Sequence, residues 1–230
     1  MEMNKNILAS LVLISSGLSL SAHAADSFNI NVTGVISPAA CQANITGGET
    51  IDYGTIPANT LTADARTLLP AKQTAFTITC DAPAKLGFRT VDNRAASKMT
   101  SDEVVTFDWG STWNTSLMNG LGVDGQGNNI GGWAAELTAM SSDTVSAPEG
   151  IYSTDDGATW AKRSTPAVMS FLSQGDFVYS VSKPGSAVPV AFSTFTGTLA
   201  VQAVIAPAST LDLSQPVTLD GSVTVEMVYL

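Results

Sequence analysis

The stretch VTLDGSVTVEMVYL, residues 217–230, ends the chain and alternates apolar with polar side chains. One parity carries only apolar residues and glycine, namely Val217, Leu219, Gly221, Val223, Val225, Met227 and Tyr229. Successive side chains of a β-strand point to opposite faces, so the pattern predicts a strand with one apolar face. That face must be covered by another part of the chain or by another molecule.

A segment with a matching pattern lies near the other end of the chain. Phe28, Ile30 and Val32 alternate with polar residues between residues 25 and 34, which predicts a short extended arm that ends at Gly34. Two terminal segments of complementary pattern indicate strand pairing between molecules.

Residues 1–24 have the features of a secretory signal peptide. Lys5 precedes an apolar run over residues 7–20, which closes on the small-x-small sequence Ala22-His23-Ala24. The run is too short to span a bilayer, and no later segment is longer. We therefore expect an exported protein that starts at Ala25 and has no transmembrane segment.

Cleavage also removes His23, which is the only histidine of the 230-residue chain. Without histidine, Ser-His-Asp and Cys-His catalysis and the commonest zinc-ligand sets are lost. The formal net charge of −10 disfavours a nucleic-acid partner. We expect a protein that is not an enzyme and that uses no cofactor and no metal.

The chain has two cysteines, Cys41 and Cys80. An even pair in an exported chain predicts a disulfide, whereas redox catalysis would require two thiols close in sequence. Closing a loop of about 40 residues would stabilise the fold by roughly 4 kcal/mol on chain-entropy grounds.

Short strand-like segments, separated by Gly, Pro, Asn and Asp, predict an all-β sandwich that occupies residues 35–230 as a single domain. The expected strands lie at residues 41–46, 51–56, 75–80, 86–91, 104–109, 130–140, 150–153, 160–163, 169–172, 188–192, 195–205 and the C-terminal stretch. The glycine-rich middle, roughly residues 95–165, is interpreted as an enlargement of this domain.

Two motifs in the middle region resemble known ligand-binding or turn motifs. Residues 120–128, with several glycines and Asp124, lack the following helix of a phosphate loop and the regular oxygens of a calcium loop, so they predict hairpin turns. Residues 153–160, STDDGATW, match the Asp-box S-x-D-x-G-x-T-W, which indicates a β-hairpin whose side chains tie off the turn.

All four tryptophans lie in the same region, so glycan binding stays open as an alternative to simple packing. They are Trp109, Trp113, Trp133 and Trp160. Adjacent carboxylates such as Asp155 and Asp156 point to opposite faces of a strand and therefore form no acid-base pair.

Several motifs together resemble the subunits of chaperone-usher fimbriae. They are VTGVISPAAC at residues 32–41, IDYG at 51–54, FTITC at 76–80 and the penultimate Tyr229 on an alternating strand. The middle motifs VDNR at residues 91–94, GLG at 120–122 and GNNIG at 127–131 look most like the β-type fimbrial major subunits.

The resemblance implies an incomplete immunoglobulin-like sandwich, the pilin fold, which lacks its last strand. The donor strand would carry Phe28, Ile30 and Val32, and the groove strand that meets the chaperone would carry Val223, Val225, Met227 and Tyr229. The implied partners are a periplasmic chaperone, an outer-membrane usher and neighbouring fimbrial subunits. The implied location is the bacterial cell surface, reached through the periplasm, with a role in cell adhesion.

Two other function classes compete with a structural pilin. One is a carbohydrate-binding minor or tip subunit, an adhesin. The other is a secreted glycan-active protein, for which the sequence offers no reactive constellation.

Overall fold

The computed structural model describes residues 29–35 and 39–230, so the signal peptide and Phe28 lie outside the described residues. The chain divides into two units, Met1–Ser37 and Pro38–Leu230. In the first unit, residues 29–35 form no regular secondary structure. The described part of the second unit consists of β-strands and four single 3-10 turns, which confirms the predicted all-β fold. No helix in the described ranges is long and apolar enough to cross a membrane.

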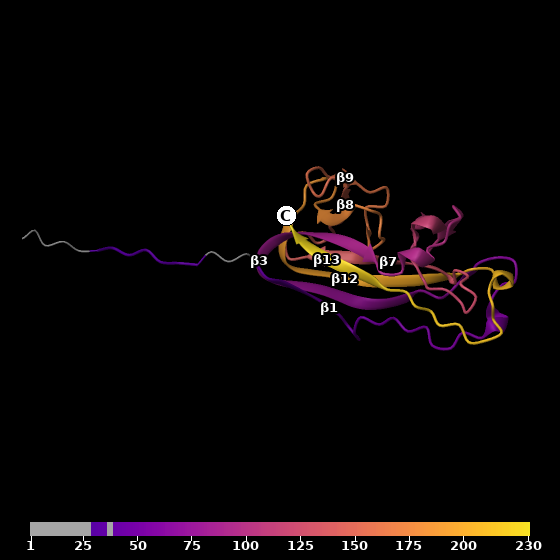
Figure 1. Cartoon of the computed structure of the whole chain (residues 1–230). Coiled ribbons are helices and arrows are strands. Elements are labelled where there is room, and N and C mark those ends of the chain that lie inside the picture. The colour runs from indigo at the N-terminus through magenta and orange to yellow at the C-terminus, as the bar shows by residue number, and fades with distance from the viewer. Residues whose placement is uncertain (1–28, 36–38) are drawn as a thin grey trace, which may run out of the picture. The chain divides into compact units, whose positions relative to one another are not determined.

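The longest strand, β3 (Lys72–Asp92), belongs to both layers of the fold. Its first half pairs with β1 (Cys41–Ile45) and with β12 (Ala191–Ile205). Its second half pairs with β13 (Val223–Tyr229) and with β11 (Val178–Ser182). In Figure 1, β3 curls over at the end of the molecule where β13 ends, and so passes from one layer to the other.

The remaining strands extend the two layers away from β3. The first layer continues from β12 to β7 (Gly131–Ser142), and the second continues from β11 to β8 (Glu149–Ser153). Short strands complete them, namely β2 (Thr67–Leu68), β6 (Asn119–Gly120), β9 (Ala161–Lys162) and β10 (Met169–Ser170), beside a separate hairpin of β4 (Val104–Thr106) and β5 (Thr112–Asn114). The 3-10 turns are η1 (Ala58–Thr60), η2 (Ala95–Ser97), η3 (Thr115–Leu117) and η4 (Ala208–Thr210).

The main core lies between the two layers. Phe76 and Ile78 come from the first half of β3, and Leu86 and Phe88 come from its second half, and all four are buried in the same cluster. A smaller cluster lies against the β4–β5 hairpin, and a third gathers Ile130 and other apolar residues near the segment that leads into β13. The main core is therefore built around one strand, β3, which contributes side chains from both layers.

The structure differs from the predicted strands in several places, including the following. Residues 51–56 form no strand, because Gly54 adopts a positive φ of 65° and its N–H binds Asp52 Oδ1 at 2.7 Å. The predicted strands at 75–80 and 86–91 are parts of one strand, β3. The predicted strands at 188–192 and 195–205 likewise merge into β12, which begins at Ala191. The buried strand β11 was not predicted, and neither were the short strands β2, β5 and β6.

The Asp-box forms the predicted hairpin between β8 and β9. Asp155 accepts hydrogen bonds from the Thr159 hydroxyl at 2.6 Å and the Ser153 hydroxyl at 2.7 Å, and Ser153 Oγ accepts the Gly157 N–H at 2.8 Å. The Thr159 hydroxyl, followed by that of Ser153, lowers the pKa of Asp155 to about 2. The motif thus fixes the turn between β8 and β9.

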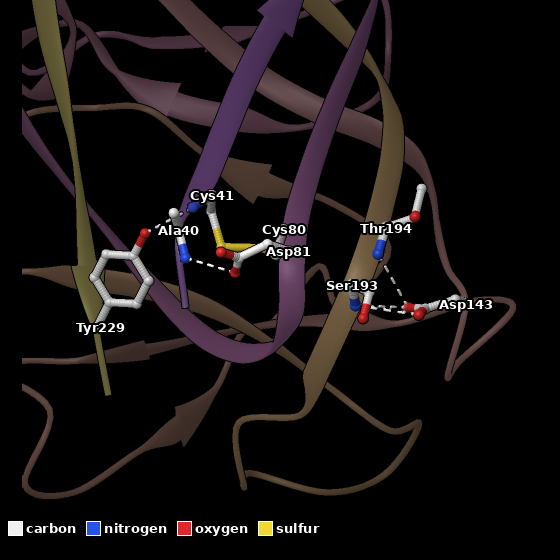
Figure 2. Close-up of a disulfide and its surroundings, with 8 residues drawn as sticks. All are labelled: Ala40, Cys41, Cys80, Asp81, Asp143, Ser193, Thr194 and Tyr229. Atoms are coloured by element: carbon white, nitrogen blue, oxygen red, sulfur yellow. Dashed lines mark hydrogen bonds between the residues drawn. A yellow bond between two sulfur atoms is a disulfide. The ribbon is translucent and has the colours of Figure 1, made fainter. Parts of the chain in front are cut away.

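The predicted disulfide between Cys41 and Cys80 is present (Figure 2). The two residues face each other directly in the β1–β3 pairing, with a Cα–Cα distance of 4.0 Å. Next to it, Asp81 Oδ1 accepts the Ala40 N–H at 2.8 Å. The start of β1 is therefore held to β3 by a covalent bond and by hydrogen bonds.

We predict that the double variant Cys41→Ala/Cys80→Ala loses about 4 kcal/mol of unfolding free energy. The closed loop has a sequence separation of 39, and the bridge removes the corresponding freedom from the unfolded chain. Urea unfolding of the variant and of the oxidised protein would measure the difference. Equal midpoints and slopes for the two proteins would contradict the prediction.

Candidate functional site

The C-terminal strand β13 is an edge strand. It pairs with β3 from Val223 opposite Asp92 to Tyr229 opposite Leu86, and no other described strand pairs with it. Half of its main-chain N–H and C=O groups therefore point away from the sheet, where another strand could bind them. All four predicted groove-strand residues, Val223, Val225, Met227 and Tyr229, lie on β13.

The predicted strand was too long at its N-terminal end, because β13 starts at Val223 and not at Val217. Asp220 does not take part in the main-chain pairing with β3. Its N–H binds the Leu121 carbonyl at 3.0 Å, and its carboxylate accepts two hydrogen bonds from Arg94 at 2.7 and 2.9 Å. The Arg94 hydrogen bond lowers the pKa of Asp220. Residues 217–222 therefore bind the loops around residues 94 and 121 instead of β3.

The apolar row of β13 is only partly covered. Met227 packs against the main core, whereas Val225 and Tyr229 remain 38% and 49% exposed. Glu226, on the opposite face, lies 3.9 Å from Arg89. The strand thus has a polar face with its own ion pair and an apolar face that the described chain leaves half open.

The first strand, β1, is the matching edge of the other layer. It pairs only with β3 among the described strands, and Cys41 and Ile45 pack against the main core. The Cys41 N–H donates to the Tyr229 hydroxyl at 2.9 Å, which joins the start of β1 to the end of β13 (Figure 2). The two layers therefore end in free edges on the same side of the sandwich.

A cavity of about 730 Å³ lies between the segments that adjoin these two strands in the sequence. Residues 50–56, which follow β1, line one side, and residues 213–219, which lead into β13, line the other. Ile130, Ile205 and Leu61 contribute apolar atoms to its lining. We call the half-open face of β13, the edge of β1 and this cavity together the edge groove.

Tyr53 fixes one wall of the edge groove. Its hydroxyl donates to the Val201 carbonyl at 3.3 Å and accepts the Ala203 N–H at 3.2 Å, both on β12. Burial raises the pKa of Tyr53, so the phenol stays protonated at neutral pH and keeps both bonds. The IDYG motif at residues 51–54 therefore forms a wall of the groove. The predicted strand at 51–56 gave no indication of this role.

The edge groove offers main-chain groups of β13 that no described strand pairs with, and a partly apolar lining. The described residues contain no group of three or more His, Cys, Asp and Glu side chains that could hold a metal ion. The lining of the cavity is mainly apolar, with Asp52 as its charged member. An added strand would gain main-chain hydrogen bonds along β13 and would place alternate side chains in the groove.

Of the predicted donor residues, Ile30 and Val32 are described and are 78% and 93% exposed, and Phe28 lies outside the described residues. Their role as a donor strand stays a prediction. Residues 29–35 pair with no strand within the described part of the chain.

Comparison with known proteins gives one family and two relatives of similar length. A family described as "Protein of unknown function (DUF1120)" matches residues 30–134. The chain is 27% identical to "Protein GltF" of Escherichia coli (strain K12), with all of both chains covered. It is also 27% identical to "Uncharacterized protein YhcF" of the same organism, covering 96% of this chain and 98% of the relative. The chain is therefore similar to these proteins over nearly its whole length.

The free edge predicts a specific pattern of amide hydrogen exchange in the monomeric protein. Amides of β13 that face β3 should exchange slowly, and the alternate amides that face the opening should exchange faster by at least tenfold, because water reaches them directly. Nuclear magnetic resonance of β13 would resolve both sets. Uniform protection along Val223–Tyr229 in a monomer would mean that the edge is already paired.

Proposed function

We propose that the protein is a structural subunit of a chaperone-usher fimbria and that it supports adhesion of the bacterial cell. In this proposal residues 25–34 of one subunit lie as a donor strand in the edge groove of the next subunit. The observation that carries the proposal is the pair of free edges, β1 and β13, beside an apolar opening at the C-terminal strand. The motifs that resemble fimbrial subunits support it further.

The apolar side chains of the arm match the needs of the edge groove. Phe28, Ile30 and Val32 share one parity, so all three would face the groove from a bound strand. Each would contribute about 1.5–3 kcal/mol on burial, or about 5–9 kcal/mol together before the cost of ordering the arm. Main-chain bonds to the free edge of β13 would add to this.

The lengths also agree. The seven residues of β13 extend over about 23 Å at the rise of a strand. Ten extended arm residues reach at most about 35 Å, so they can follow the strand and continue along the cavity at residues 50–56 and 213–219.

Donation from one subunit to the next generates a fibre. The donor and acceptor surfaces are different parts of the chain, so the contact is head-to-tail and leaves a free arm at one end and a free groove at the other. Before assembly, an open edge beside apolar side chains promotes aggregation. A periplasmic chaperone that binds β13 would cover that edge, and an outer-membrane usher would exchange the chaperone strand for the arm of the next subunit.

The proposal predicts that Ile30→Asp abolishes polymerisation in the producing bacterium, whereas Asn31→Asp leaves it nearly unchanged. Both variants add one negative charge to the arm, but only position 30 lies on the parity that would enter the groove. Electron microscopy of surface fibres and gel analysis of unheated surface extracts would measure the polymer. Since the arm contributes nothing to the core described for residues 39–230, both variants should reach normal periplasmic levels.

Polymers of normal length from Ile30→Asp would contradict donation by this face of the arm. Equal loss in both variants would also contradict it, because the effect would then depend on charge and not on the side chain that enters the groove.

A further inference from the structure

A second cavity, of about 340 Å³, lies apart from the edge groove and shares no lining residue with it. It is bounded by β5, β8, β9, β11 and the loop before β11. Its aromatic lining consists of Trp113, Tyr152, Phe177 and Tyr179. The volume falls at the small end of the range that small-molecule sites occupy, about 300–1,000 Å³, and suits a group the size of one sugar ring.

Aromatic rings form a platform in this cavity, which we call the aromatic pocket. Tyr152 and Phe177 are stacked, with ring centroids 5.4 Å apart and planes 11° apart. Phe177 in turn contacts Tyr179, with centroids 6.1 Å apart. A rigid, partly exposed ring surface offers large contact area with little loss of conformational freedom. The C–H face of a sugar ring packs on surfaces of this kind.

Three residues that line the aromatic pocket each carry a buried donor with no partner in the described chain. The donors are Arg163 Nε, Gln174 Nε2 and the Tyr179 hydroxyl. The side chain of Arg163 is 8% exposed, and Tyr179 is 1% exposed. Such atoms are uncommon in folded proteins, because each loses its bonds to water on burial. Only three further buried side-chain atoms in the described chain lack a partner, so half of the set belongs to residues that line this one cavity.

Tyr179 is available as a donor at neutral pH. Burial raises its pKa to about 12, and Arg163 opposes that rise. The hydroxyl therefore stays protonated, and it can donate to an acceptor placed in the pocket.

A buried carboxylate, that of Glu136, holds the Arg163 side chain in place. Its Nη2 lies 3.3 Å from Oε1 of Glu136, which is fully buried on β7. Trp113 also donates to Glu136, at 3.1 Å, as do Trp109 and Ser170. The guanidinium lies over the rings of Trp113 and Tyr179, at 5.4 and 5.8 Å from their centroids. Arg163 is thus preorganised, and its Nε remains for a ligand.

Lys162 gives the aromatic pocket its net charge. The charges of Arg163 and Glu136 balance each other, whereas Lys162 is exposed and forms no ion pair with a described residue. The Asp-box hairpin fixes its position, since Lys162 on β9 pairs with Ile151 beside Tyr152 on β8. A pocket of positive charge on a chain of net charge −10 favours a ligand with an anionic group.

We propose that the aromatic pocket binds an acidic saccharide. The sugar ring lies against Tyr152 and Phe177, and the carboxylate and hydroxyl oxygens accept hydrogen bonds from Lys162 and from the three buried donors. Donor-strand pairing between subunits would use the edge groove and not the aromatic pocket. Saccharide binding is therefore independent of the proposed fimbrial function. An acidic peptide offers the same carboxylate but makes no use of the stacked ring platform.

The test is titration of the full exported chain with sodium D-glucuronate, followed by nuclear magnetic resonance of the Trp113 indole N–H and the Gln174 side-chain amide. We expect saturable shifts of both signals. Methyl β-D-glucopyranoside keeps the ring without the charge and should bind at least about tenfold more weakly, a difference of about 1.4 kcal/mol. N-acetyl-L-aspartate amide keeps a carboxylate without the ring and should bind more weakly by a similar factor.

Lys162→Gln should weaken glucuronate binding about tenfold, and Gln174→Ala should also weaken it. Lys183→Gln is the matched control, because Lys183 is an exposed lysine outside the pocket, and it should bind like the unchanged protein. Lys162 is exposed, so its replacement leaves the fold intact.

Any of three results would overturn the proposal. The first is the absence of saturable shifts with glucuronate at tens of millimolar. The second is binding that neither Lys162→Gln nor Gln174→Ala weakens. The third is equal or tighter binding of N-acetyl-L-aspartate amide, which would identify a site for acidic peptides.

Discussion

The unpaired edge of β13 is the constraint on which the rest of this structure depends. A strand at the end of the chain has one neighbour, β3, and its other side presents free N–H and C=O groups beside half-covered apolar side chains. The opposing layer ends in β1, which pairs with no described strand on its outer side. A closed sandwich would require one more strand here, and within the described residues the chain supplies none.

The features around the opening keep it in a defined shape. The disulfide holds β1 to β3, the Tyr229 hydroxyl binds the start of β1, and Tyr53 is fixed to β12 by two hydrogen bonds. Binding of a strand therefore requires little rearrangement of the groove, which reduces the entropy that the complex must lose. This arrangement leaves an exposed edge, which under the proposed function would need protection until a strand fills it.

Local patterns in the sequence were sufficient for the all-β fold, the disulfide, the Asp-box hairpin and the residues of β13. Each depends on alternation or on short spacing that the chain itself displays. The pairing of β3 was not predictable in the same way, because Asp81 and Pro83 interrupt its alternation. The structure accommodates this interruption where the pairing with β12 shifts register between Phe192 and Thr194, so the missing Pro83 N–H breaks no regular ladder.

Buried polar residues account for two features that were not predicted, strand β11 and the contacts of Glu136. Strand β11, VYSVS, is buried on both faces, so it shows no alternation, and the Ser180 hydroxyl is satisfied by the Leu86 carbonyl at 2.7 Å. Glu136 lies among apolar residues of β7, and a charge in a buried strand requires partners, but the predicted strand at residues 130–140 made no use of this signal. The identity of those partners, Arg163 and two tryptophan indoles among them, depends on tertiary contacts that only the fold reveals.

Within the described residues the sandwich lacks one strand, and we propose that the arm supplies it. The most direct measurement moves residues 25–34 from the N-terminus to a position after Leu230, joined by a turn of about four residues. The same protein with the Ile30→Asp change in the moved segment is the control. The account predicts a monomer whose Tm lies about 10 °C or more above that of the control, since 1 kcal/mol shifts Tm by about 2–4 °C at this size. Equal Tm values for the two proteins would contradict it.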